Sequence, residues 1–266
     1  MHWSEAVTLL RRTGRAGVLV SILDVRGHAP RNAGAKMVVA AEGCWGSIGG
    51  GNLERVATEQ ARAMLADPAR LAGPEQFVDR LNHLVSGKQA QQCCGGEVTV
   101  VLEPLPALPT VAILGVGHVG LAIARLLARL EVCLVLVDSR PEMVTDLRLA
   151  EVAAEAACLS ARHLMVPEAI LDELPPGAEV LVMTHDHAED FAILDAALRR
   201  PALGWIGLIG SSVKWGNFRR RLAEAGFSDD DIARITCPIG LPGIAGKEPA
   251  VIAVSVVADF LRRRSA

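Results

Sequence analysis

The chain lacks a marked excess of charge of either sign. Its 27 lysines and arginines face 30 aspartates and glutamates, which leaves a formal net charge of −3 at pH 7 over 266 residues. Binding nucleic acid through a general basic field requires a clear excess of positive charge. We therefore expect no nucleic-acid partner.

Long apolar runs are also missing. A membrane-spanning helix needs about 18 or more consecutive apolar residues, and the longest candidate, VIAVSVVADFL, is interrupted by Asp259. The first residues, MHWSEAVTLLRRTG, include a glutamate and lack the apolar segment of a signal peptide. Because 51% of the residues are hydrophobic, a substantial core is possible. We expect a cytoplasmic protein that makes no membrane contact.

The six cysteines lack the C-x₂₋₄-C spacing of a structural zinc site. Six cysteines in so long a chain also do not indicate a disulfide-stabilised secreted domain, so we expect reduced thiols. Cys93 and Cys94 are neighbours in QQCCGGEV. Adjacent Cα atoms lie about 3.8 Å apart, whereas disulfides usually need about 4.4–6.8 Å. Either these cysteines pack beside a glycine turn, or they present a thiol to a ligand.

A proline-rich segment, PLPALP at 104–109, predicts a domain boundary because it suits neither a helix nor a central strand. We expect a smaller α+β domain over 1–105 and a Rossmann-like parallel-sheet domain over 109–266. In the first, the patterns predict strands at 16–25, 36–41, 77–85 and 97–103, and helices at 4–13 and 52–66 with Ser4 and Asn52 as caps. In the second, they predict strands at 111–114, 132–137, 179–184 and 204–209, and helices at 118–130, 166–174, 188–199, 212–225 and 249–263.

The second part carries a Rossmann motif. Gly115, Gly117 and Gly120 form G-x-G-x-x-G between a predicted strand and a predicted helix, and Asp138 follows 23 residues after Gly115 at the end of the next strand. Backbone N–H groups at such a helix start bind phosphate. The motif either binds an anion or serves only as scaffold.

Further candidates follow the later strands of the predicted sheet, where open α/β sheets bind ligands. His185 and His187 end one strand as a possible metal pair or as a polar rim, and Gly210 with Ser211 starts a helix after the next. The segment CPIGLPGIAGKEPA (237–250) is long for a connection and suits a wall around a large flat ligand.

The first part has its own glycine-rich turn, GSIGGGNLE. Gly49, Gly50 and Gly51 precede the predicted helix and could form an anion-binding nest. Glu54 in the first helical turn would compete with an anionic ligand for the helix dipole. Its alternative roles are to hydrogen-bond the polar edge of the ligand or only to stabilise the helix.

Several stretches together resemble the XdhC/CoxI family of xanthine dehydrogenase accessory proteins. They run in family order from residue 27 to residue 261: GHAPRNAGAKM, GSIGGGNLE, QQCCGGEV, ILGVGHVG, VDSR, VMTHDHAED, WIGLIGSSVKWGNFRRRL and CPIGLPGIAGKEPAVIAVSVVADFL. The segment SGKQAQ before the cysteines departs from the family pattern.

The resemblance implies a non-catalytic accessory protein that binds molybdenum cofactor. Such a protein would hold the cofactor while an oxo ligand is exchanged for sulfur supplied by a cysteine desulfurase, and would then insert it into an apo molybdenum hydroxylase such as xanthine dehydrogenase. We also expect a homo-oligomer, namely a dimer. We expect the cofactor in a cleft between the two domains, with the GSIGGG and CCGG loops on one wall and Gly115, Gly117, His118, Asp138, His185 and the 237–247 loop on the other. The expected cofactor-binding residues, with Cys94 as a molybdenum contact, are Gly49, Gly50, Gly51, Glu54, Cys93, Cys94, Gly115, Gly117, His118, Gly120, Asp138, His185, Gly210, Ser211, Cys237 and Lys247.

The alternative is an NAD(P)-dependent oxidoreductase. Asp138 suits the ribose hydroxyls of NAD, and Arg140 suits a 2′-phosphate. A dehydrogenase has no need of the GSIGGG and CCGG loops in the first part, so NAD(P) is not the expected ligand.

Overall fold

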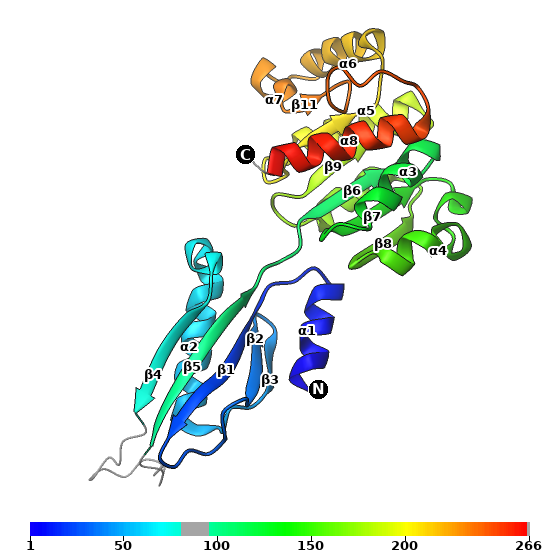
Figure 1. Ribbon diagram of the computed structural model, residues 1–266. Helices are drawn as coiled ribbons and strands as arrows, with labels where there is room; N and C mark the ends of the chain where they lie inside the picture. Colours follow the sequence, from blue (N-terminus) through cyan, green and yellow to red (C-terminus); the bar gives the residue numbers. More distant parts are fainter. Residues whose placement is uncertain (81–95, 265–266) are drawn as a thin grey trace. The chain divides into compact units, whose positions relative to one another are not determined.

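The computed structural model describes residues 1–80 and 96–264. The chain forms two compact units, Met1–Leu108 and Pro109–Ala266 (Figure 1). No helix within the described residues is long and apolar enough to cross a membrane.

The first unit is an antiparallel sheet between two helices. Its five described strands lie in the order β3 (Gly43–Gly46), β2 (Lys36–Ala40), β1 (Gly17–Arg26), β5 (Glu97–Leu105) and β4 (Glu75–Arg80). Successive side chains of a strand point to opposite faces. Val38 of β2 therefore packs with α1 (Trp3–Arg12), and Val39 packs with α2 (Gly51–Ala66).

Most of the elements expected in this unit are present, but their ends differ. α1 is capped by His2 rather than by Ser4, and α2 is capped by Gly50 rather than by Asn52. β5 runs into the proline segment as far as Leu105, pairing Pro104 with Val18 of β1. This is tolerated because β4 pairs with β5 only as far as Leu102, so no second strand needs an N–H from Pro104.

The second unit is a parallel sheet with helices on both sides, as the alternating pattern predicted. The strand order among the described residues is β11-β10-β9-β6-β7-β8. The strands are β6 (Thr110–Leu114), β7 (Cys133–Asp138), β8 (Cys158–His163), β9 (Glu179–Val182), β10 (Ile206–Leu208) and β11 (Ile235–Thr236). The helices are α3 (His118–Leu127), α4 (Asp146–Glu155), α5 (His187–Leu198), α6 (Ser212–Glu224), α7 (Asp229–Ala233) and α8 (Pro249–Arg264).

Four of these elements were not predicted: α4, β8, α7 and β11. β8 is an edge strand with half of its residues exposed, so CLSARH has no clear apolar run. α7 and β11 are too short for a periodic pattern. The helix expected at 166–174 is a 3₁₀ segment, η3 (Pro167–Glu173).

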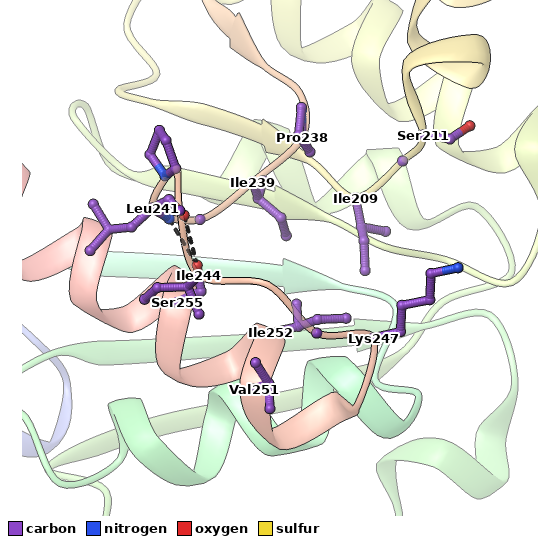
Figure 2. A pocket seen from close by; sticks show the side chains of 15 residues that line it. Ile209, Ser211, Pro238, Ile239, Leu241, Ile244, Lys247, Val251, Ile252 and Ser255 are labelled. Carbon is purple, nitrogen blue, oxygen red and sulfur yellow. Dashed lines mark hydrogen bonds between the residues drawn. The ribbon is translucent and has the colours of Figure 1, made fainter.

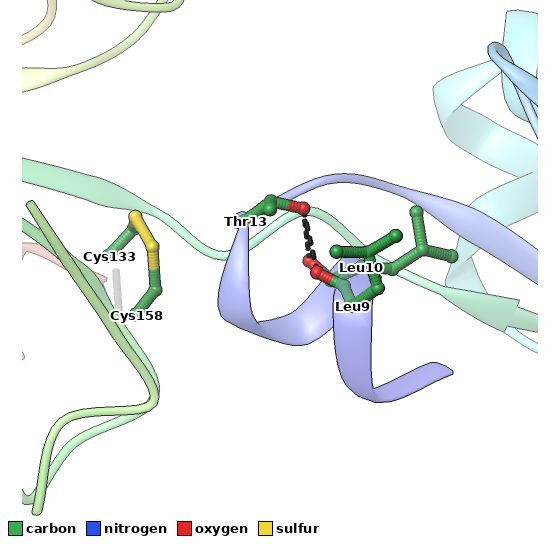
Figure 3. The surroundings of a disulfide bond; sticks show 5 residues. All are labelled: Leu9, Leu10, Thr13, Cys133 and Cys158. Atoms are coloured by element: carbon green, nitrogen blue, oxygen red, sulfur yellow. Dashed lines mark hydrogen bonds between the residues drawn. A yellow bond between two sulfur atoms is a disulfide. The ribbon is translucent and has the colours of Figure 1, made fainter. Parts of the chain in front are cut away.

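The structure joins Cys133 and Cys158 in a disulfide (Figure 3). The two residues are direct partners in the register of β7 and β8, with Cα atoms 4.5 Å apart. The expectation that all thiols are reduced is therefore wrong for this pair. Because no strand was predicted at β8, no pattern in the sequence indicated that cysteines 25 positions apart would meet.

Candidate ligand pocket at the carboxyl edge of the parallel sheet

The strand order places a switch point between β6 and β9. From β6 the chain continues to β7 and β8 on one side, and from β9 it continues to β10 and β11 on the other. Open parallel sheets bind ligands beyond the carboxyl ends of their strands near such a point. We therefore expect a ligand site in the loops that follow these six strands.

The glycine loop after β6 has the geometry that its motif predicts. Gly115 has φ +104°, and an added Cβ would lie 2.3 Å from the carbonyl oxygen of Met183. A Cβ on Gly120 would lie 2.2 Å from the carbonyl oxygen of Gly115. Gly117 caps α3 and has open space around its missing Cβ. Two of the three glycines thus serve close packing, and Gly117 leaves room above the helix start, next to exposed His118.

Asp138 is turned into the protein at the end of β7. Its buried carboxylate accepts hydrogen bonds from the Val116 N–H (2.7 Å), from the Arg140 N–H (3.0 Å) and from the Arg140 guanidinium (2.9 and 3.0 Å). Burial by itself raises the pKa of Asp138, but these donors outweigh it and hold the pKa below its ordinary value. The two residues that the NAD(P) alternative assigns to the nucleotide therefore bind each other.

Arg148 lies beside the same loop and was missed by sequence reasoning. It donates to the carbonyl oxygen of Val116 (3.2 Å), and its buried Nε has no partner among the described residues. Arg148 belongs to α4, which the sequence did not predict, so no signal connected it with the glycine motif.

A buried ion pair supports the carboxyl ends of β9 and β10. Asp190 is fully buried and accepts from the N–H (2.9 Å) and the hydroxyl (2.8 Å) of Thr184, and from Lys214 Nζ (2.5 Å). Lys214 also donates to the carbonyl oxygen of Ile209 (3.1 Å). The pair ties α5 and α6 to the strand ends. The sequence analysis also missed Asp190, because only the two histidines of HDHAED were considered as functional candidates.

Those histidines do not form a metal centre in the part of the chain described. His185 Nδ1 lies 3.9 Å from Glu189, and His187 meets the Phe218 ring edge-on. No group of three or more histidine, cysteine, aspartate or glutamate side chains in residues 1–80 and 96–264 could hold a metal ion. Glu189 accepts from the Ser139 hydroxyl (2.9 Å), and burial raises its pKa. The polar-rim interpretation fits this arrangement.

A pocket of about 710 Å³ opens between the end of β10, the loop before α8 and the first turns of α8 (Figure 2). Its lining is mostly isoleucine, leucine, valine, proline and glycine, with Ser211, Ser255 and Lys247 as the polar members. The full lining is Ile209, Gly210, Ser211, Pro238, Ile239, Gly240, Leu241, Pro242, Gly243, Ile244, Gly246, Lys247, Val251, Ile252 and Ser255.

The loop is anchored on α8. Leu241 donates its N–H to the Ser255 hydroxyl (2.9 Å), which donates to the Leu241 carbonyl oxygen (3.4 Å); the dashed lines of Figure 2 mark this contact. Gly240 has φ +98°, and a Cβ there would lie 2.4 Å from the Ser255 hydroxyl oxygen. Only glycine lets the loop approach the helix this closely.

Cys237 lies beside the pocket. Its thiol donates weakly to the Gly210 carbonyl oxygen (3.8 Å), and a Cβ on Gly210 would lie 3.4 Å from the sulfur. Burial raises the pKa of Cys237 to about 11, against the smaller opposing effect of Lys214. The thiol is therefore protonated at neutral pH.

In the first unit, Glu54 fills the glycine turn. Its Oε2 accepts from the Ser47 hydroxyl (2.7 Å), the Ile48 N–H (3.2 Å) and the Gly50 N–H (3.0 Å). Gly49, Gly50 and Gly51 all have positive φ, at +123°, +74° and +62°. The nest exists, and the carboxylate of the chain itself occupies the position expected for a ligand anion.

The structure thus distributes the predicted residues over three places. Gly210, Ser211 and Lys247 line the pocket, and Cys237 adjoins it. Gly115, Gly117, His118, Gly120, Asp138 and His185 lie along the carboxyl edge, and Gly49, Gly50, Gly51 and Glu54 lie in the first unit. Cys93 and Cys94 lie outside the described residues. Contact of these residues with a cofactor, and a cleft shared by the two units, stay predictions.

The family model of the XdhC Rossmann domain matches residues 111–260, and that of the XdhC and CoxI family matches residues 10–72. A solved Bacillus halodurans structure, described as a xanthine dehydrogenase, has 21% sequence identity and a TM-score of 0.49, with 100% of this chain and 96% of that chain covered.

Two Escherichia coli K12 proteins are similar in sequence. The uncharacterized protein YqeB is 31% identical over 246 residues, so this chain, 92% of which aligns, spans 43% of the length of YqeB. The molybdenum cofactor insertion chaperone PaoD is 26% identical over 273 aligned positions, which cover 93% of this chain and 83% of PaoD. Since the Rossmann-domain match alone spans more than half of the sequence, the chain belongs to the XdhC family.

Proposed function

We propose that this chain binds molybdenum cofactor as cargo and inserts it into an apo molybdenum enzyme. Family membership and the similarity to PaoD, a molybdenum cofactor insertion chaperone, support this role. The observation that carries the proposal is the pocket of about 710 Å³ beside the loop before α8. A chaperone of this kind has no turnover of its own.

The lining suits the chemistry of the cargo, which combines a pterin, a phosphate, a dithiolene and an anionic molybdenum centre. The volume falls within the range of about 300–1,000 Å³ that is usual for small-molecule sites. Ile239 and Ile252 offer apolar walls for a flat ring, and the bare backbone of the glycines can approach its polar edge. Lys247 supplies positive charge, and the nearby Cys237 thiol is a soft group suited to a thiophilic metal.

Finer features of the role are also part of the proposal. The client is a molybdenum hydroxylase such as xanthine dehydrogenase, and a cysteine desulfurase supplies the sulfur that replaces an oxo ligand while the cofactor is held. The protein acts in the cytoplasm as a homodimer. The first unit, with its glycine turn and Cys93 and Cys94, contributes to cofactor binding or to delivery.

Blocking the pocket tests the proposal. Ile244 lines the pocket and is 43% exposed, so Ile244→Trp adds bulk there without burying it in the core. Val254 is 53% exposed on α8 and does not line the pocket, which makes Val254→Trp a matched control. Bound cofactor per protein chain and activation of an apo-hydroxylase should both fall for Ile244→Trp alone. Equal retention of the cofactor by both variants would remove the pocket from the proposal.

The oxidoreductase alternative is tested with the same protein. Because Asp138 and Arg140 bind each other, we expect no saturable binding of NADH or NADPH when nucleotide fluorescence is followed during titration. Tight binding of either nucleotide together with no cofactor binding would favour the alternative.

A further inference from the structure

We propose that the pocket holds the phosphate end of its ligand at Lys247 and Ser211, so that it is specific for a phosphomonoester. This inference rests on the proposed function and extends it, because it assigns an orientation to the cofactor. It also predicts that removal of the phosphate from the ligand weakens binding.

The ammonium group of Lys247 differs from those of the other described lysines. Lys36 donates to the Ser21 hydroxyl (2.7 Å), and Lys214 is bound to Asp190 and to a backbone carbonyl. Across residues 1–80 and 96–264, Lys247 Nζ makes no hydrogen bond or ion pair. It is thus a cation without a counter-ion in the lining of an otherwise largely apolar pocket.

The nearest acidic neighbour in sequence does not neutralise it. Glu248 turns its carboxylate back to accept the backbone N–H of Lys247 (3.0 Å). This contact closes the turn before α8 and leaves the ammonium group available. A ligand without negative charge would leave this cation unmatched.

Ser211 supplies a second polar group on the same side. Figure 2 shows Ser211 and Lys247 at the right of the pocket and Leu241 and Ile244 at the left. Ser211 caps α6 and accepts the Lys214 N–H (3.2 Å), which leaves its own O–H free to donate. Ammonium and hydroxyl donors are hard groups that suit phosphate oxygens.

The remaining lining suits the body of the ligand. Ile209, Ile239 and Ile252 present apolar side chains, and Gly240 and Gly243 present bare backbone. A flat ring placed among them, with its phosphate at Lys247 and Ser211, matches apolar surface with apolar surface and charge with charge. The reverse orientation would place the phosphate among Leu241 and Ile244, where no charged group lines the pocket.

The test compares two ligands and three proteins. Equilibrium binding of intact molybdenum cofactor and of phosphatase-treated cofactor is measured for the full-length wild type, for Lys247→Gln and for Arg162→Gln. Arg162 is exposed on β8 at the other end of the sheet order and pairs with Glu173, so its loss controls for net charge. Lys247→Arg keeps the charge and tests rescue.

We expect Lys247→Gln to weaken binding of the intact cofactor about tenfold, as loss of a charge-assisted hydrogen bond does. Binding of the treated cofactor should not change, and Lys247→Arg should restore most of the loss. Equal affinity of the wild type for both ligands, or an equal loss for both ligands in Lys247→Gln, would overturn the phosphate subsite and leave the chaperone role standing. Failure of the wild type to bind either ligand would refute the chaperone role, and the subsite with it.

Discussion

The two glycine-rich segments of this chain look alike in sequence and differ in what they enclose. In the turn before α2, Glu54 reaches back and takes up N–H groups of the turn. In the loop before α8, the Glu248 carboxylate accepts the N–H of Lys247, and Ser255 binds the loop through Leu241. The first segment is closed by its own carboxylate, and the second borders a pocket. Glycine content before a helix thus identifies a close backbone turn, but the neighbouring side chains decide whether a ligand can enter it.

The largest expected effect concerns the buried ion pair of Asp190 and Lys214, which holds the ends of β9 and β10 together. Asp190→Ala leaves Lys214 buried without its carboxylate, and we expect a loss of about 3–5 kcal/mol in the free energy of unfolding. Asp195→Ala on the same helix removes a surface pair with Arg199 and should cost less than about 1 kcal/mol. Urea denaturation compares the two variants. Equal losses would mean that the buried pair does not hold the strand ends together.

The next prediction compares Glu54, which we expect to stabilise the fold, with Lys247, which we expect to bind the ligand. Glu54→Ala leaves the Ile48 and Gly50 N–H groups without their acceptor and should destabilise the protein by about 1–3 kcal/mol. Lys247→Gln should change stability by less than about 0.5 kcal/mol, because its ammonium group has no partner to lose within the described residues.

Thermal and urea unfolding measure both variants, with Glu59→Ala on the exposed face of α2 as a control for Glu54. A stable Glu54→Ala protein that binds phosphate more tightly than wild type would show that the first glycine turn is a ligand site that Glu54 guards.

The turn before α2 and the loop before α8 should also differ in how well they tolerate a side chain in place of a single glycine. Both Gly49 and Gly243 have positive φ, which costs a side chain about 1–2 kcal/mol. A Cβ on Gly49 would also lie 2.7 Å from the Cβ of Pro30, whereas Gly243 has no neighbour within 4 Å. Gly49→Ala should therefore be the more destabilising of the two in urea unfolding. The opposite order would mean that the loop before α8 is packed more tightly than the turn before α2.

The smallest expected effect concerns the reactivity of the Cys237 thiol. Because burial raises the pKa of Cys237 to about 11, its thiol should react slowly with iodoacetamide at neutral pH, and the rate should rise until about pH 11. Lys214→Met should raise the pKa further, since it removes a nearby positive charge. Peptide mass spectrometry can follow Cys237 beside exposed Cys44 in one sample. A rate for Cys237 that levels off near neutral pH would show that the thiolate forms there.

The sequence by itself determined that the second unit is a parallel α/β sheet with a Rossmann motif, which glycines its first loop requires, and the family. The motif is largely a local feature: Gly115 has a positive φ, and a Cβ on Gly120 would lie 2.2 Å from the carbonyl oxygen of Gly115, five residues before it. Tertiary structure decided that Asp138 binds Arg140, that Glu54 fills its turn, that Cys133 meets Cys158, and that Lys247 lines a pocket with no partner for its ammonium group among the described residues. The physical reason is that each of these outcomes depends on where a side chain points and what is packed against it, and the spacing of residues along the chain fixes neither.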